Sequence, residues 1–125
     1  MSFSEVTWVG IVRESGLTEM LETAMVFDTN GRTLFWHEPP GRSGSYLPDS
    51  RSLWQVLWDN RLKGGTGLLA GVAHTHPWIG EAFPSQTDLT TFRALDLGLG
   101  QELIWPIVTL TDVLFLKWSR KAEKY

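Results

Sequence analysis

The sequence predicts an α/β domain of the α+β layered kind, in which a central mixed β-sheet is flanked by two to three helices. Short β-rich segments alternate with segments of helical periodicity, an Asn-Gly pair separates two apolar runs, and one apolar run closely follows a helical segment. A chain of 125 residues is long enough for one hydrophobic core and short for two. We therefore expect a single domain over residues 1–125.

The first half of the chain is expected to contain a strand, a helix, a hairpin and a loop. Residues 5–12 alternate and are rich in β-branched side chains, which indicates a strand, and residues 14–24 are expected to form a short helix. The Asn-Gly pair within residues 24–38 predicts a tight hairpin. Residues 38–50 concentrate Pro, Gly and Ser, so we expect an exposed loop.

The middle of the chain predicts a helix followed by a buried strand. The helix is expected to begin at Asp49 or Ser50 and to end at Gly64-Gly65, because Leu and Trp recur at helical spacing between them. Residues 68–74 are apolar on both faces, which is typical of a buried central strand.

A second helix and a second hairpin are expected after this strand. Ser85 precedes a helical pattern that continues to residue 98, so it is expected to cap that helix. Residues 104–110 and 113–118 are apolar runs on either side of a Thr-Asp turn, which predicts a terminal hairpin.

The composition narrows the possible functions. There is no cysteine, so histidine and carboxylate side chains would have to hold any transition metal. The chain lacks a run of about eighteen apolar residues and a secretory leader, so we expect a cytoplasmic protein without a membrane partner. The net charge is −3, and the only basic cluster is the terminal segment 117–125, so we do not expect nucleic acid as a partner.

Two of the three histidines of the chain lie together, at the end of the expected central strand. His74 and His76 are two residues apart, and alternate strand residues share a face, so both imidazoles can reach one ion. Asp88 is expected in the first turn of the next helix, where it can face back toward them. Two imidazoles and a carboxylate leave a fourth position for water, as in catalytic zinc sites. We therefore predict that His74, His76 and Asp88 bind Zn²⁺.

Each part of this pattern also has a structural interpretation. An HxH pair arises by composition alone in some chains, and a Ser followed three residues later by Asp is typical of a helix cap. The conjunction of both with Pro77 and a short loop favours the metal site. The third histidine, His37, is expected to have a structural or surface role.

The pattern His74-x-His76-Pro77, a loop, then Ser85-x-x-Asp88 resembles the signature of the JAMM or MPN+ (JAB domain) zinc metallopeptidases. It is similar to both the deubiquitinating members and the bacterial RadC-type proteins, and the order of elements resembles that fold over most of the chain. The loop from His76 to Ser85 is one residue longer than the family pattern. The resemblance implies a cytidine-deaminase-like JAB/MPN fold of the small prokaryotic or viral type.

The resemblance also implies roles for residues outside the ligand set. An upstream glutamate is the general base in that family, and Glu22 fits best because the following residues are similar to the family's strand start. Glu19 becomes the better candidate if the strand starts sooner, and Glu14 is third. Ser85 would stabilise the oxyanion, act as a helix cap, or do both.

The implied activity is that of a zinc-dependent peptidase or isopeptidase, similar to a deubiquitinase. Its substrate would be the C-terminal tail of a ubiquitin-like or sulfur-carrier protein, bound as an extended strand. Residues 38–50 and the segment Trp78 to Phe83 are the expected contacts. A RadC-like or phage-associated domain that binds protein or nucleic acid is the alternative, and a metal-free scaffold of the MPN-minus kind is the third possibility.

Overall fold

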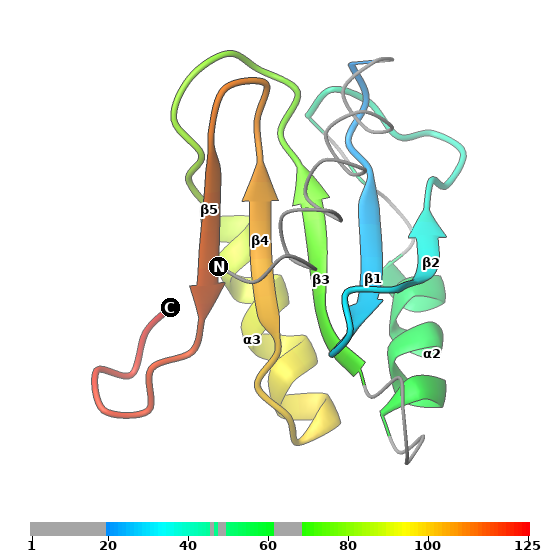
Figure 1. The fold of residues 1–125 in the computed structure, drawn as a ribbon, viewed down its shortest axis with the longest axis vertical. Helices are drawn as coiled ribbons and strands as arrows, with labels where there is room; N and C mark the ends of the chain where they lie inside the picture. The colour runs from blue at the N-terminus through cyan, green and yellow to red at the C-terminus, as the bar shows by residue number, and fades with distance from the viewer. Residues whose placement is uncertain (1–19, 46, 48–49, 62–68) are drawn as a thin grey trace.

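Five strands form one mixed sheet in the computed structural model, which describes residues 20–45, 47, 50–61 and 69–125. The strands are β1 (Ala24–Asp28), β2 (Thr33–His37), β3 (Leu69–Thr75), β4 (Ile104–Val108) and β5 (Val113–Lys117) (Figure 1). Their order is β2-β1-β3-β4-β5, and β3 pairs antiparallel with β1 and parallel with β4. The predicted mixed sheet is confirmed, with the apolar run before the histidines as its central strand.

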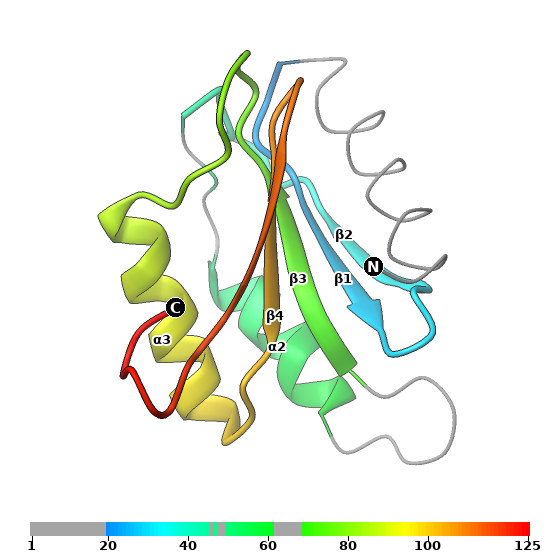
Figure 2. The ribbon, with the colours of Figure 1, turned by 60° about the vertical axis from the view of Figure 1, so that its left-hand side comes forward.

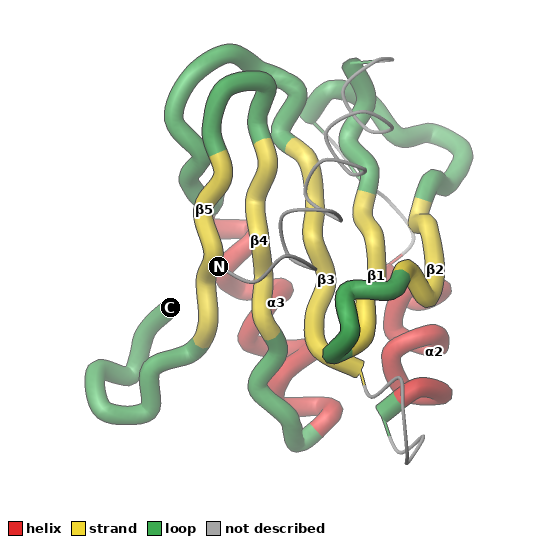
Figure 3. The backbone as a smooth tube through the Cα atoms, viewed as in Figure 1, coloured by secondary structure: helices red, strands yellow, loops and turns green. Residues whose placement is uncertain are grey.

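Two helices pack on the same face of the sheet within the described part of the chain. They are α2 (Ser50–Asn60) and α3 (Gln86–Leu99); Figure 3 shows both behind the strands, and in the turned view of Figure 2 α3 lies to the left of the sheet. Parallel strands require a crossover connection, and α3 supplies it between β3 and β4. The start of α3 therefore lies near the carboxyl end of β3, where the two histidines are.

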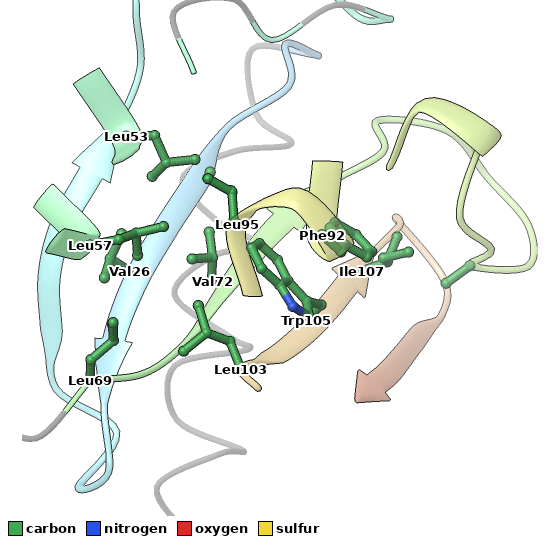
Figure 4. Close-up of a cluster of buried hydrophobic side chains, with 12 residues drawn as sticks. Val26, Leu53, Leu57, Leu69, Val72, Phe92, Leu95, Leu103, Trp105 and Ile107 are labelled. Carbon is green, nitrogen blue, oxygen red and sulfur yellow. The ribbon is translucent and has the colours of Figure 1, made fainter. Parts of the chain in front are cut away.

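The main hydrophobic core lies between this face of the sheet and the two helices (Figure 4). Its central members are less than a tenth exposed, and they include Val26, Val72, Trp105 and Ile107 from the sheet and Leu53, Leu57, Phe92 and Leu95 from the helices. A second buried cluster contains Met25, Phe27, Ala73 and Val108. Each of these residues is adjacent in the sequence to a member of the main core. Because successive strand residues alternate between faces, the second cluster lies on the opposite side of the sheet.

Both predicted hairpins are confirmed. The first connects β1 and β2 through a turn in which Gly31 has φ 78°, a conformation that favours glycine. The Asp28 N–H donates to the Arg32 carbonyl (3.0 Å), which leaves three residues in the turn, so it is wider than the tight Asn-Gly turn expected. The Asp28 carboxylate also accepts hydrogen bonds from the backbone N–H groups of Asn30 and Arg32. The second hairpin connects β4 and β5.

The helix expected over residues 14–24 does not reach its predicted end. Residues 20–23 are not helical, and β1 begins at Ala24. The backbone N–H of Glu22 donates to the Ser43 carbonyl, and that of Thr23 donates to the Thr75 hydroxyl, so these residues are bound to other segments rather than to a helix. Residues 14–19 and the strand expected over 5–12 lie outside the described residues.

The loop before α2 is irregular in its described residues, as predicted, but it is not simply exposed. Pro39 is buried, and the Arg42 guanidinium donates to the Glu22 carbonyl and the Thr23 hydroxyl. The helix begins at Ser50, one of the two predicted starts, and ends at Asn60, before the predicted end at Gly64-Gly65, which lies outside the described residues. Neither described helix is long and apolar enough to cross a lipid bilayer.

Candidate metal centre

His74 and His76 project from the end of β3 on the same side, as predicted. The strand ends at Thr75, but the backbone N–H of His76 still donates to the Val108 carbonyl (2.8 Å), which continues the pairing with β4. The Nε2 atoms of the two imidazoles are 3.0 Å apart. Both residues are buried, with 6% and 4% of their surfaces exposed. Two nitrogen donors therefore point at one location.

Asp88 reaches the same location from the first turn of α3. Its Oδ2 atom lies 3.1 Å from Nε2 of His76 and 3.5 Å from Nε2 of His74. Ser85 is the N-cap residue: its Oγ accepts from the Asp88 N–H (3.0 Å), and the Asp88 carboxylate accepts from the Ser85 N–H (2.9 Å). The same carboxylate thus completes the helix cap and faces both histidines, so the extra loop residue does not displace it.

Glu22 joins the two histidines from the segment before β1. Ala24 is paired with His74 in an antiparallel register. The residue two positions before Ala24 therefore faces the residue two positions after His74. This register brings Glu22 next to His76. One ligand atom from each of Glu22, His74 and His76 lies within 4.8 Å of the others, and all three residues are buried. The alternatives Glu19 and Glu14 lie outside the described residues.

A pair of threonines fixes this arrangement. The Thr75 N–H donates to the Thr23 carbonyl (2.9 Å), and the Thr23 N–H donates to the Thr75 hydroxyl (2.9 Å). These bonds extend the β1–β3 pairing by one residue and so set the position of Glu22. Local sequence patterns do not predict these bonds. A Thr between the two histidines was visible, but its partner was not, because 52 residues separate the two.

The ionisation of these groups favours metal binding. Burial would raise the pKa of Asp88, but hydrogen bonds from His74, His76 and the Ser85 backbone together lower it well below its usual range. Burial lowers the pKa of His74, although Asp88 opposes this change. An ionised carboxylate and a neutral imidazole are the forms that coordinate metals. Burial raises the pKa of Glu22, with an opposing effect from His76.

The donor geometry fits a tetrahedral zinc ion. The three distances among Nε2 of His74, Nε2 of His76 and Oδ2 of Asp88 are 3.0, 3.1 and 3.5 Å. Ligand atoms about 2.0–2.1 Å from a tetrahedral ion are about 3.3 Å from one another. Nitrogen and carboxylate oxygen are also ligands that zinc accepts. The residues present could hold the predicted ion, with Glu22 close enough to act as a base or as a further ligand.

Aromatic side chains pack against both imidazoles. The Trp78 ring centroid is 4.4 Å from that of His76, and the Phe92 centroid is 5.6 Å from that of His74. Nδ1 of His76 is buried and has no hydrogen-bond partner among the described residues. Metal-binding histidines usually have such a partner. Packing by Trp78 therefore acts on the His76 ring together with the contacts of its Nε2 atom to His74 and Asp88.

The donor cluster opens into a cleft of about 690 Å³. His37 lines this cleft and is 3% exposed, so of the structural and surface roles expected for the third histidine, its burial fits the structural one. The signal that could have revealed it is its position at the end of β2. There it pairs with Ala24, the residue whose other neighbour is His74.

A comparison with models of known protein families gives no match, and a comparison with curated protein sequences gives none either. The resemblance to the JAMM metallopeptidases therefore stays a prediction from the motif residues.

Proposed function

We propose that this chain is a zinc-dependent metallopeptidase or isopeptidase of the JAMM type. The observation that supports this most is the convergence of His74, His76 and Asp88, whose donor atoms lie within 3.5 Å of one another at the end of a cleft. A zinc ion bound there would supply a Lewis acid that acidifies a water molecule and polarises a substrate carbonyl. These three side chains would hold the ion and leave its fourth position open to solvent and substrate.

Glu22 is the proposed general base. It is buried beside the two imidazoles, and its carboxylate belongs to the same cluster of potential donors. In this position it would accept the proton of the attacking water and pass it to the leaving nitrogen. The backbone of Glu22 is held in place, because its carbonyl accepts from the Arg42 guanidinium and its N–H donates to the Ser43 carbonyl. The next residue, Thr23, donates its N–H to the Thr75 hydroxyl.

Ser85 is suited to two tasks at once. Its hydroxyl oxygen accepts a hydrogen bond from the Asp88 N–H, which leaves the hydroxyl proton free to point elsewhere. We infer that this proton is donated to the oxyanion that develops on the substrate carbonyl. Helix capping and oxyanion stabilisation then coexist.

The proposed substrate is the C-terminal tail of a ubiquitin-like or sulfur-carrier protein. Ile79 and Phe83 are exposed on the loop that follows the histidines, with 79% and 53% of their surfaces accessible. The loop is held in place, because Gly80 and Ala82 bond to the Thr111 and Asp112 side chains in the β4–β5 turn. A fixed loop with exposed apolar side chains suits contact with a protein partner.

The closeness of Glu22 also favours a second candidate function, a closed and non-catalytic zinc site. If Glu22 coordinates the ion together with His74, His76 and Asp88, four protein ligands leave no position for water. The chain would then be a metal-stabilised binding module, as in the RadC-like or phage-associated alternative. The two functions differ in what Glu22 does for zinc affinity.

Hydrolysis and zinc binding measured on the same variants distinguish these functions. The substrate is a ubiquitin-like protein fused through its C-terminus to a fluorescent amine, and zinc affinity is measured by calorimetry. We expect Glu22→Gln to keep zinc and lose hydrolysis by about 10²-fold or more, His74→Ala to lose both, and the control Asp59→Asn, on the exposed side of α2 away from the cleft, to lose neither. Loss of zinc affinity in Glu22→Gln without any hydrolysis in the native chain would favour the closed site instead.

A further inference from the structure

The cleft extends beyond the donor cluster as an apolar cavity between the sheet and the two helices. Its wall combines residues from five elements and the loop before α2, each of them at least partly buried: Ala24, Leu47, Leu53, Val72, Phe92 and Trp105. Figure 4 shows Leu53, Val72, Phe92 and Trp105 facing one another from α2, β3, α3 and β4. The cavity is thus formed by rigid elements rather than by a surface loop.

Among the described residues that line this cleft, the charged side chains lie at one end. The only Asp, Glu, Lys or Arg side chains among its described lining residues are Glu22 and Asp88, and both face the histidines. A charged group in the deeper part would therefore find no opposite charge, and its burial would be costly. An uncharged apolar group would instead gain by leaving water.

A row of paired residues sets the length of the cleft. His37, Ala24 and His74 are neighbours on β2, β1 and β3, so their side chains lie on one face. Adjacent strands are about 4.8 Å apart, so His37 is roughly 10 Å from His74, which is about three residues of an extended chain. The small side chain of Ala24 lies between them and leaves room above the sheet.

We propose that this cleft is a specificity subsite for a large aliphatic or aromatic side chain of the substrate, within about three residues of the bond that is cleaved. The proposal rests on the proposed function, because the donor cluster at the mouth of the cleft supplies the reaction. It goes further in naming the side chain that the enzyme selects. A glycine-rich tail without such a side chain would leave the cavity empty and bind weakly.

Peptide binding to the metal-free chain tests the subsite without the reaction. The probes are the peptides acetyl-Gly-X-Gly-Gly-amide with X as Leu, Phe, Gly or Asp, followed by NMR of ¹⁵N-labelled tryptophan side chains in the presence of a chelator. The Trp105 indole N–H, which donates to Asp96 (3.1 Å), reports from the cavity wall. We expect the Leu and Phe peptides to bind roughly tenfold or more tightly than the Gly and Asp peptides and to shift this signal.

Two adjacent threonines on α3 provide a matched pair of variants. Thr91 lines the cleft, whereas Thr90 is exposed on a different side of the helix. Thr91→Phe should fill the cavity and abolish the preference for Leu and Phe, and Thr90→Phe should keep it. Thr91→Leu, a smaller addition, replaces Thr91→Phe if that variant does not fold.

Equal binding of the Leu and Gly peptides, or a preference that persists in the Thr91 variants, would overturn the subsite. Hydrolysis of the fusion substrate is measured separately with zinc. An enzyme that cleaves the fusion but shows no side-chain preference would retain the proposed function and lose the proposed subsite.

Discussion

Thr75 is the residue that joins the histidine segment to the segment that carries Glu22. It lies between His74 and His76, and its hydroxyl accepts a hydrogen bond from the Thr23 N–H, which is buried. Removal of the hydroxyl leaves that donor unsatisfied, which costs about 1–3 kcal/mol.

We therefore expect Thr75→Val, which keeps the shape of the side chain, to lower the unfolding free energy by about 1–3 kcal/mol. Thr75→Ser retains the hydroxyl and is the matched control, with a smaller loss. Urea denaturation of the metal-free proteins measures both. Equal stability of the Val variant and the native chain would show that this bond does not hold the Glu22 segment.

Asp96 is a buried carboxyl outside the candidate metal centre, and its titration affects stability. Its Oδ1 accepts from the Leu103 N–H (3.0 Å) and the Trp105 indole (3.1 Å), and its other oxygen accepts from the Tyr125 hydroxyl. Burial nevertheless raises the pKa of Asp96 above its ordinary value. Between the ordinary and the raised pKa, the folded chain keeps a proton that the unfolded chain has lost, so this contribution to stability falls as the pH rises.

Asp96→Asn keeps the Oδ1 acceptor but does not titrate. We expect the difference in unfolding free energy, variant minus native chain, to grow as the pH rises from about 4 toward neutrality. Urea denaturation at several pH values, with a chelator present, measures this difference. Parallel stability curves for the two proteins would mean that the pKa of Asp96 is not raised by folding.

The histidine pair shows which site residues local patterns can predict. The period of two along a strand is enough to align His74 and His76, and a helix start three residues before Asp88 is enough to orient its carboxylate. Glu22 required the family resemblance, because its place depends on the pairing of β1 with β3. The place of His37 in the cleft could not be predicted for the same reason, since only the sheet order brings it there.

The start of α3 is the element that links the fold most directly to the site. Ser85 and Asp88 satisfy each other's backbone donors there, and the same carboxylate faces the histidines. A mutation at Ser85 therefore tests capping and catalysis together, and a substitution that keeps the cap can separate them.

We expect Ser85→Ala to lower the unfolding free energy by about 1 kcal/mol, and Ser85→Asp to retain most of the stability, because Asp is also a good N-cap. Both variants lose the hydroxyl proton, so both should lose hydrolysis of the fusion substrate. Thermal unfolding and the fluorescence assay provide the two measurements. Full activity in Ser85→Asp would limit the role of the native side chain to capping.

The pairing of β3 with β4 depends on a glycine in the centre of the sheet. A Cβ atom on Gly71 would lie 2.1 Å from the Ile104 carbonyl oxygen and 2.8 Å from the Phe27 ring. Neither a backbone oxygen nor a buried ring can move away easily, so the strands would have to separate.

We expect Gly71→Ala to destabilise the chain by about 1–3 kcal/mol or more. Gly98→Ala is the control, because its Cβ would meet only the Trp54 side chain at 3.0 Å and a helical position gains from Ala. Chemical denaturation compares the two variants. A loss in Gly98→Ala as large as that in Gly71→Ala would contradict the close approach of β3 and β4.

Local signals predicted the long elements better than the short segment before β1. Residues 14–24 have helix-forming side chains, but the end of this segment is held by Ser43 and Thr75, which are distant in the sequence. The loop over residues 38–50 has the composition of an exposed loop, yet Arg42 binds it to Thr23. Such contacts override local propensity, and one sequence does not contain them as a pattern.

At the scale of the whole molecule, the sheet order brings the site together. The antiparallel β1–β3 pair supplies Glu22 and the histidines, and the parallel β3–β4 pair makes α3 return with Asp88 at its start. The mixed sheet was predicted from the alternation of elements, but the order of its strands was not. Strand order depends on contacts between distant segments, which periodicity does not encode.

We propose that this assembly binds one divalent cation through His74, His76 and Asp88. The most direct measurement is the metal content of the chain purified without chelators or an affinity tag, together with that of His74→Ala and Asp88→Ala. We expect about one zinc ion per native chain and a strong loss of zinc in both variants. A native chain without zinc that also fails to bind added zinc, or variants that retain it fully, would contradict the claim.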